Sequence, residues 1–125
     1  MNTIKLKNKE ITIECNAASP VIHKRLWNEN LMQKLQHLNP EDIMESLDFI
    51  ERAVYTFHLT AEKGVLEALK TKIEEEEYIM FLSGFEMMEF ANIDVLSQIM
   101  EAWGINIKSD SIPKNLQSPQ QENLQ

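Results

Sequence analysis

The sequence is poor in cysteine and glycine, and each shortage excludes a class of site. Only one of its 125 residues is a cysteine, Cys15, so no internal disulfide can form, which is consistent with a reducing compartment. The three glycines, Gly64, Gly84 and Gly104, are widely separated. A glycine-rich phosphate-binding loop requires closely spaced glycines and is therefore excluded.

Long apolar segments are also missing. The longest apolar runs, such as residues 79–82, are far shorter than the roughly 20 residues that cross a bilayer. Residues 1–15 alternate lysine with isoleucine and leucine, and they lack the continuous apolar segment of a secretion signal. We therefore expect a cytoplasmic protein that does not bind membranes.

Basic residues are outnumbered, with 12 lysines and arginines against 20 aspartates and glutamates and a formal net charge of −8. Because nucleic-acid binding depends largely on neutralising phosphates, this balance argues against a nucleic-acid-binding protein. Residues 1–38 hold six basic and three acidic side chains, whereas the remaining 87 hold six and 17. This asymmetry favours head-to-tail contact between copies, in a possible homo-oligomer. Solvated faces without a partner are the alternative.

Residue patterns typical of catalysis or metal binding are absent from the sequence. None of His23, His37 and His58 pairs with another histidine or cysteine at the short spacing of zinc sites. The acids between residues 41 and 48 have a spacing that is more typical of a solvated helix face than of a catalytic pair. The glutamates at 74–77 lack the glycine and alternating ligands of a calcium-binding loop. We expect no enzymatic activity, metal or cofactor.

Two alternating segments near the start of the chain predict a β-hairpin. Residues 3–6 and 10–14 alternate polar and apolar side chains, and residues 7–9 between them have the length of a tight reversal. An isolated hairpin is marginally stable in water, so its apolar face must cover helices or pair with another chain. The hairpin is therefore either a lid on the core or an exposed docking edge.

Helix start signals and apolar periodicity predict two helices after the hairpin. Ser19, which is followed by proline, starts a helix whose apolar spacing continues without interruption to Leu38. Asn39, also followed by proline, starts a second helix. Its apolar residues recur at spacings of three and four and predict an end near His58.

The second half of the chain predicts two or three further helices. Thr60 is expected to cap a helix whose buried stripe consists of Leu66, Leu69 and Ile73. Whether that helix continues through the glutamates at 74–77 stays open, but a break or bend is expected near residues 83–84. The last helix is expected to start near Asn92 and to stop at Gly104.

Residues 108–125 contain two prolines and many glutamines, serines and asparagines, with little to bury, so they predict a disordered polar C-terminal tail. The predicted fold is thus mainly α. It has an N-terminal β-hairpin within residues 3–14, followed by a bundle of four to five amphipathic helices within residues 20–104. Residues 1–107 are expected to form a single domain.

Residues 78–107 contain four of the seven methionines together with several aromatic side chains. Not all of these residues fit one helical stripe, so some apolar surface is expected to stay uncovered, and methionine-rich surfaces adapt to varied partners. We predict a partner-binding face that consists of Tyr78, Met80, Phe81, Phe85, Met88, Met100 and Trp103. The preceding acids are expected to guide a partner electrostatically; they are Glu74, Glu75, Glu76 and Glu77.

In size, acidity and order of elements, residues 1–107 resemble the tail assembly chaperones of long-tailed bacteriophages and prophages. The features that carry the resemblance are the hairpin, the helix started by Ser19 and proline, the acidic amphipathic helices, the final helix over residues 93–103 and the polar tail. The resemblance implies a non-enzymatic factor in the cytoplasm of the host bacterium. Such a factor binds and solubilises the tape measure protein, helps recruit tail tube protein subunits and is absent from the mature virion.

Two other functions stay open. An acidic helical inhibitor or mimic would bind a basic nucleic-acid-binding protein in a salt-sensitive way. A structural adaptor would instead be retained in the virion. The chaperone hypothesis predicts a largely apolar and salt-tolerant partner interface.

Overall fold

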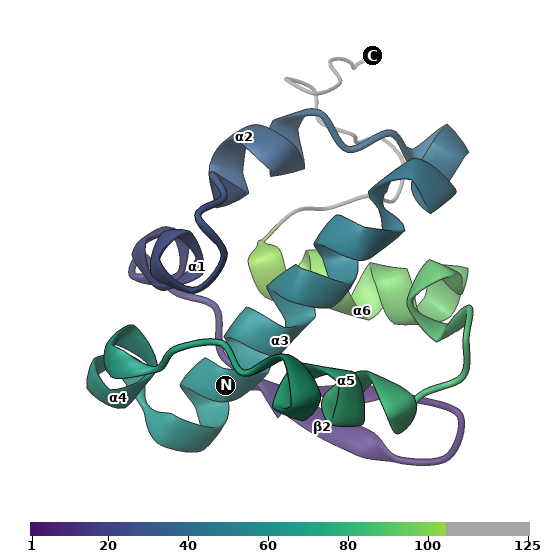
Figure 1. Cartoon of the computed structure of the whole chain (residues 1–125). Helices are drawn as coiled ribbons and strands as arrows, with labels where there is room; N and C mark the ends of the chain where they lie inside the picture. The colour runs from purple at the N-terminus through teal and green to yellow at the C-terminus, as the bar shows by residue number, and fades with distance from the viewer. Residues whose placement is uncertain (105–125) are drawn as a thin grey trace.

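The hairpin and the helices predicted from the sequence are both present in the computed structural model, which describes residues 1–104 (Figure 1). The mainly helical fold is thereby confirmed. The predicted tail and the last three residues of the predicted domain lie outside the described residues. The elements in chain order are β1 (Asn2–Lys5), β2 (Glu10–Ile13), α1 (Ser19–Trp27), α2 (Leu31–Gln36), the 3₁₀ helix η1 (Pro40–Ser46), α3 (Leu47–Lys63), α4 (Val65–Lys70), α5 (Glu75–Ser83), the 3₁₀ helix η2 (Glu89–Ala91) and α6 (Ile93–Trp103).

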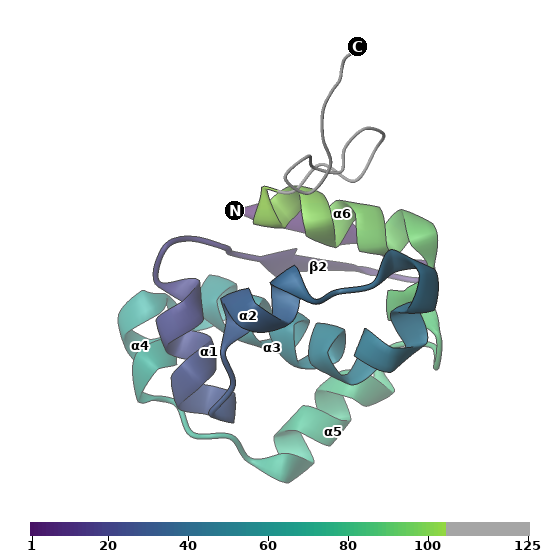
Figure 2. The same cartoon turned by 90° about the horizontal axis from the view of Figure 1, so that it is seen from above.

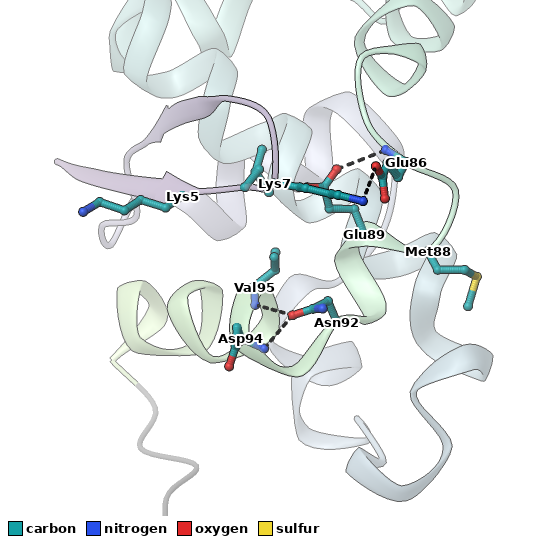
Figure 3. A pocket seen from close by; sticks show the side chains of 9 residues that line it. Lys5, Lys7, Glu86, Met88, Glu89, Asn92, Asp94 and Val95 are labelled. Carbon is teal, nitrogen blue, oxygen red and sulfur yellow. Dashed lines mark hydrogen bonds and ion pairs between the residues drawn. The ribbon is translucent and has the colours of Figure 1, made fainter.

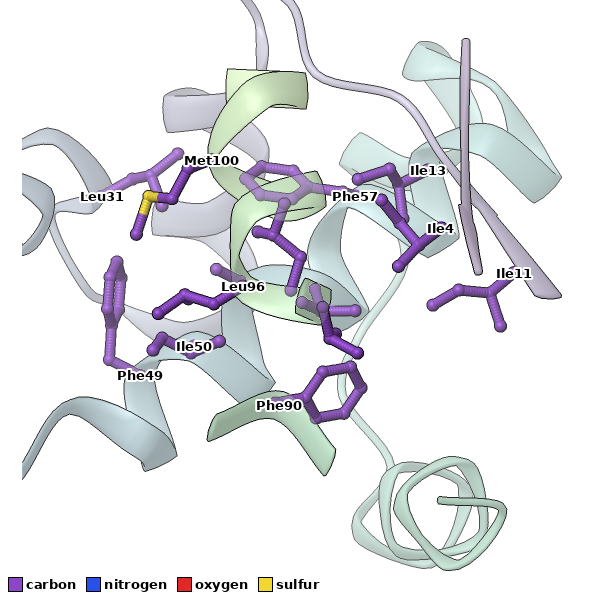
Figure 4. Close-up of a cluster of buried hydrophobic side chains, with 14 residues drawn as sticks. Ile4, Ile11, Ile13, Leu31, Phe49, Ile50, Phe57, Phe90, Leu96 and Met100 are labelled. Atoms are coloured by element: carbon purple, nitrogen blue, oxygen red, sulfur yellow. The ribbon is translucent and has the colours of Figure 1, made fainter. Parts of the chain in front are cut away.

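The central element is α3, which is surrounded by the other helices and the hairpin (Figures 1 and 2). One side of α3 packs with the hairpin, α6 and η2 in the larger core cluster, where Ile50 and Phe57 are completely buried (Figure 4). Its other side packs with α1 and α4 in a smaller cluster around Tyr55 and Leu59. Burial on both sides explains why α3 is the longest helix, since most of its stability comes from packing.

The hairpin lies on the core as a lid. Ile4 and Ile11 are paired across the two antiparallel strands, and both are buried against the larger cluster. The Gln98 side chain of α6 bonds to the outer edge of β1: it accepts from the Lys5 backbone N–H at 2.7 Å and donates to the Lys5 carbonyl at 2.9 Å. On β2, His58 bonds through Nδ1 to the Thr12 carbonyl at 2.9 Å. The lid alternative is therefore the one that the structure adopts.

The prediction of one continuous helix from Ser19 to Leu38 is wrong, because the chain breaks between α1 and α2. Asn28 has a left-handed conformation with φ 55° and ends α1, a backbone state that asparagine tolerates better than most residues. Asn30 then caps α2 by accepting a hydrogen bond from the Gln33 N–H at 3.0 Å. The break turns Glu29 inward, where it binds Arg52 of α3.

The second predicted helix is capped at the predicted residue, but its first turns and its end differ from the prediction. Asn39 accepts a hydrogen bond from the Glu41 N–H at 3.0 Å, as a cap does. The first turns of the predicted helix form the 3₁₀ helix η1, which is kinked at Asp42 (φ −137°, ψ 63°), and α3 begins after it. The predicted end near His58 is wrong, because α3 continues to Lys63.

Thr60 does not cap a new helix. It is buried inside α3, and its hydroxyl donates to the Thr56 carbonyl one turn earlier at 2.8 Å. The break comes four residues later at Gly64, whose φ of 86° favours glycine. The predicted stripe is only partly correct: Leu69 of α4 and Ile73 after it are partly buried, but Leu66 is exposed, and the fully buried residue of α4 is Ala68.

The last two predicted boundaries are confirmed. The predicted break near residues 83–84 coincides with the end of α5 at Ser83. Helix α6 is capped by Asn92, which accepts from the Asp94 N–H at 2.9 Å, and it ends at Gly104 with a left-handed φ of 88°. The question left open at the glutamates is also answered, because Thr71 has extended backbone and α5 starts afresh at Glu75.

Candidate protein interaction site

Helix α5 is rich in apolar side chains, yet none of its residues is fully buried. Tyr78, Phe81 and Leu82 lie at spacings of three and four, so they share one face of the helix, and all three are partly buried. Ile79 and Met80 lie on the other side of the helix axis and are exposed. The helix thus has apolar groups on two sides, only one of which faces the domain.

Aromatic contacts hold the inner face of α5 on the domain. The Tyr78 ring lies 4.9 Å from Trp27 of α1 and 5.1 Å from Tyr55 of α3, with edge-to-face geometry. The Phe81 ring lies 5.0 Å from Tyr55 and stacks on His58 at 5.3 Å. Because Phe81 packs against both core clusters, it fixes the orientation of α5.

The outer face of α5 presents aliphatic groups to solvent. Ile79 is 54% exposed and Met80 is 70% exposed, and after the helix ends Met87 is 85% exposed and Met88 is also exposed. Figure 3 shows the Met88 side chain directed away from the neighbouring polar cluster. Ile79 and Met80 lie on α5 itself, whereas Met87 and Met88 lie in the segment that follows it. Large aliphatic side chains exposed near one another are a common property of protein-binding surfaces.

The structure separates the seven residues of the predicted binding face. Met80 and Met88 are exposed, whereas Tyr78, Phe81 and Phe85 are partly buried on the inner side. The remaining two residues, Met100 and Trp103, lie on α6 in or against the larger core cluster.

Including Met100 in a surface was wrong, because only 3% of it is exposed. Trp103 packs its ring on Phe49 and Phe57, at centroid distances of 6.2 and 5.3 Å. Two further exposed aliphatic side chains, Ile79 and Met87, were not part of the predicted face. The signal was available: aromatic residues at 78, 81 and 85 mark the inner stripe, and Ile79 falls outside it.

The four predicted guide residues, Glu74 to Glu77, are all exposed at the start of α5. Glu74 is the N-cap residue, and the other three lie in the first turn, where the helix dipole favours acidic groups. Within residues 1–104 none of the four forms an ion pair. Their charges also affect Tyr55 of α3. Burial raises the pKa of the Tyr55 hydroxyl, and the negative charges of Glu77 and Glu74 raise that pKa further.

A polar cavity of about 410 Å³ lies between the hairpin turn, η2 and the start of α6 (Figure 3). Three of its charged side chains, those of Lys7, Glu86 and Glu89, make contacts across it. The Lys7 ammonium lies 3.3 Å from Glu86, and Glu89 accepts hydrogen bonds from the backbone N–H groups of Lys7 at 2.8 Å and Glu86 at 3.0 Å. These contacts join the hairpin to η2, so we interpret the cavity as structural.

A second polar cluster, not predicted from the sequence, links the α1–α2 break to α3. Glu29 accepts two hydrogen bonds from Arg52, at 3.1 and 2.6 Å, and its Oε1 lies 2.8 Å from His23 Nε2. His23 Nδ1 lies 2.7 Å from the Thr56 hydroxyl. Burial would raise the pKa of Glu29, but the hydrogen bonds from Arg52 and His23 outweigh it and lower that pKa.

This cluster links α1 and α3, and its histidine is inaccessible to solvent, although the Arg52 side chain is 27% exposed. His23 is completely buried, and burial lowers its pKa despite the opposing effect of Glu29. A substrate cannot reach a side chain that solvent does not reach. Burial likewise raises the pKa of Cys15 to about 12, so its thiol stays protonated at neutral pH and is a poor nucleophile.

Other kinds of site find no support in the described part of the chain. Across residues 1–104, no three histidine, cysteine or acidic side chains converge as a metal-binding group would require. Every helix in the same range is too short or too polar to cross a bilayer.

Comparisons of the chain with protein-family models, with curated proteins and with solved structures gave no match.

Proposed function

We propose that this chain is a non-enzymatic assembly factor of the bacteriophage tail assembly chaperone type. In this proposal it binds and solubilises the tape measure protein, helps recruit tail tube subunits, acts in the host cytoplasm and is absent from the mature virion. The observation that carries the proposal is the outer face of α5, where Ile79 and Met80 are exposed on a helix that aromatic contacts hold in place.

The physical properties of this surface suit a temporary covering for a helical rod. Met80 is exposed on the outer face of α5, and the exposed Met87 and Met88 follow this helix in the chain. Methionine side chains are flexible and polarisable, so one surface can pack against successive segments of a rod that differ in sequence. A small apolar contact is weak by itself, but repeated copies along a rod add up and can later be displaced one by one.

Contact between neighbouring copies is part of this proposal. The basic N-terminal part of the chain is partly occupied by internal contacts, because Lys7 pairs with Glu86 and Lys9 lies over the Phe85 ring at 4.3 Å. Lys24 and Arg25 of α1 form no ion pair within residues 1–104. They are the basic groups we expect to contact an acidic face of the next copy.

The test is co-expression with a tape measure protein, the long helical rod that this proposal names as the partner. We expect the two to co-purify, and the rod to become insoluble without its partner. The double variant Ile79→Gln and Met80→Gln removes the apolar groups but retains helix propensity, so co-purification should be lost while the circular dichroism spectrum is retained.

A matched control uses Val21→Gln with Met44→Gln. These two side chains are 51% and 52% exposed and belong to α1 and η1 rather than to α5. The control variant should co-purify as well as the unmodified chain. If both double variants lose the rod equally, or if neither does, the assignment of the function to α5 is wrong.

A second candidate is an acidic inhibitor of a basic nucleic-acid-binding protein, which the exposed Glu74 to Glu77 favour. The two functions differ in their response to salt. An apolar interface should survive about 1 M NaCl, at which the screening length falls to about 3 Å, whereas an ionic one should dissociate. Capture of the partner at high salt therefore supports the chaperone, and its loss supports the inhibitor.

A further inference from the structure

The acidic and apolar groups of α5 lie on one face in a fixed order. Glu75 precedes Ile79 by four residues, and Glu76 precedes Met80 by four, so each acid lies one turn before an exposed aliphatic side chain on the same side of the helix. All four side chains are exposed. A partner that covers Ile79 and Met80 therefore also faces these carboxylates.

The acids in this region have little compensation from cations of the same chain. Residues 73–104 contain eight acidic residues and no lysine or arginine. The cations that precede them are Lys70, which pairs with Glu67 at 3.9 Å, and Lys72, which forms no ion pair within residues 1–104. The dipole of α5 stabilises its first-turn acids only partly, since it is equivalent to about half a positive charge.

The charge of the surface is unequal along its length. At the far end of α5, Ser83 and Gly84 are uncharged, and the next acid, Glu86, is paired with Lys7 at 3.3 Å. Unpaired acidic charge is therefore concentrated at the N-terminal end of the helix. A bound segment meets unpaired carboxylates at one end, whereas beyond the far end of α5 lie the Lys7–Glu86 pair and the Lys9 ammonium, which is 4.3 Å from the Phe85 ring.

We propose that the segment that binds α5 is an amphipathic helix whose apolar stripe ends in a cluster of lysine or arginine side chains, which lies over Glu75 and Glu76. This inference rests on the proposed function and specifies the chemistry of the bound segment. Complementary charges at one end set the direction in which the helix binds, while the aliphatic contacts supply most of the affinity.

The probes are two synthetic helical peptides with the same leucine stripe and a fluorescent label. One carries lysines at one end of the stripe, and the other carries glutamates there. With the full chain, fluorescence anisotropy should show the lysine peptide binding about threefold to tenfold more tightly, as expected for two exposed ion pairs. The Ile79→Gln and Met80→Gln double variant should weaken both peptides alike.

Charge reversal provides the decisive comparison. The variant Glu75→Lys with Glu76→Lys should reverse the preference and favour the glutamate peptide. Its control, Glu41→Lys with Glu45→Lys, makes the same change in net charge on η1 and should leave the preference unchanged. The milder variant Glu75→Gln with Glu76→Gln should abolish the preference without reversing it, and circular dichroism verifies that each variant is folded.

The outcomes separate this inference from the function on which it rests. Equal shifts from the α5 and η1 charge variants would mean that only net charge matters, and would overturn the inference. Failure of both peptides to bind, while the rod protein co-purifies through Ile79 and Met80, would also overturn it but leave the chaperone proposal intact. A lysine preference that depends on Glu75 and Glu76 supports the inference even if the rod protein is not the partner.

Discussion

Helices α5 and α6 belong to the same part of the chain, which has no lysine or arginine, and they have similar apolar content. They differ in how deeply their apolar side chains are buried. Helix α6 buries Val95, Leu96, Ile99 and Met100, and it is capped at both ends by side-chain or left-handed backbone geometry. Helix α5 buries no residue completely, and its N-cap residue makes no side-chain cap hydrogen bond within the described structure. Apolar content alone therefore does not decide burial. The spacing of the apolar groups around each helix does, and in α5 it leaves Ile79 and Met80 exposed for contact with another molecule.

The largest expected effect is on the α6 side of this comparison. Ile99 is completely buried in the larger core cluster. Ile99→Ala should lower the free energy of unfolding by about 2–5 kcal/mol, because it removes buried methylene groups and leaves a cavity. Urea denaturation followed by circular dichroism measures this loss. A loss as small as that of an exposed residue would mean that α6 is not part of the core.

The inner side of α5 comes next. Phe81 is partly buried and packs on Tyr55 and His58. Phe81→Ala should lower the free energy of unfolding by about 1–3 kcal/mol, less than a fully buried aromatic residue, because part of the ring is already hydrated. The variant should also bind less partner, since α5 loses its fixed orientation. Unchanged stability in urea would contradict the proposed attachment of α5 by its aromatic face.

The caps provide a third contrast. Asn92 accepts hydrogen bonds from two N–H groups of α6, at 2.9 and 3.4 Å, so Asn92→Ala should destabilise the domain by about 1 kcal/mol. Glu74 makes no such bond to α5 within residues 1–104, so Glu74→Ala should change the stability by less than about 0.5 kcal/mol. Thermal melts of the two variants test this difference. Equal shifts in Tm would show that the two helix starts are equivalent.

The smallest expected effect is on the outer face of α5. Met80→Gln should change the free energy of unfolding by less than about 0.5 kcal/mol, because the side chain is already in water and glutamine is a good helix former. The corresponding substitution Met100→Gln in α6 should be strongly destabilising, since it buries an amide without a partner. Chemical denaturation of the Met80→Gln and Met100→Gln variants measures the two losses in the free energy of unfolding. The loss should be much larger for Met100→Gln.

The features predictable from the sequence were those that local chemistry decides. Asn92 and Gly104 mark the ends of α6 because capping and left-handed geometry depend on the residue itself. The hairpin followed from the alternation of side chains around Ile4 and Ile11, which the register of the strands reproduces. In these places the local preference and the packed structure agree.

The features that could not be predicted depend on residues far apart in the sequence. The break after α1 places Glu29 against Arg52, a partner 23 residues away, and no periodicity near Glu29 indicates that contact. Thr60 has the side chain of a cap, but burial within α3 directs its hydroxyl to a carbonyl of the same helix. For Met100, helical spacing fits core and surface equally well, and only the packing of α6 under the hairpin decides between them.

The contact between Gln98 and Lys5 has a consequence for the behaviour of many copies at high local concentration. A two-stranded sheet has two free edges, and free edges invite strands from other molecules to add on and aggregate. The side-chain amide of Gln98 occupies both the N–H and the carbonyl of Lys5, as an additional strand would. If copies crowd along a rod as proposed, this contact would hinder them from joining edge to edge through this part of β1. Their contacts would then be left to side chains, which separate more readily than a shared sheet.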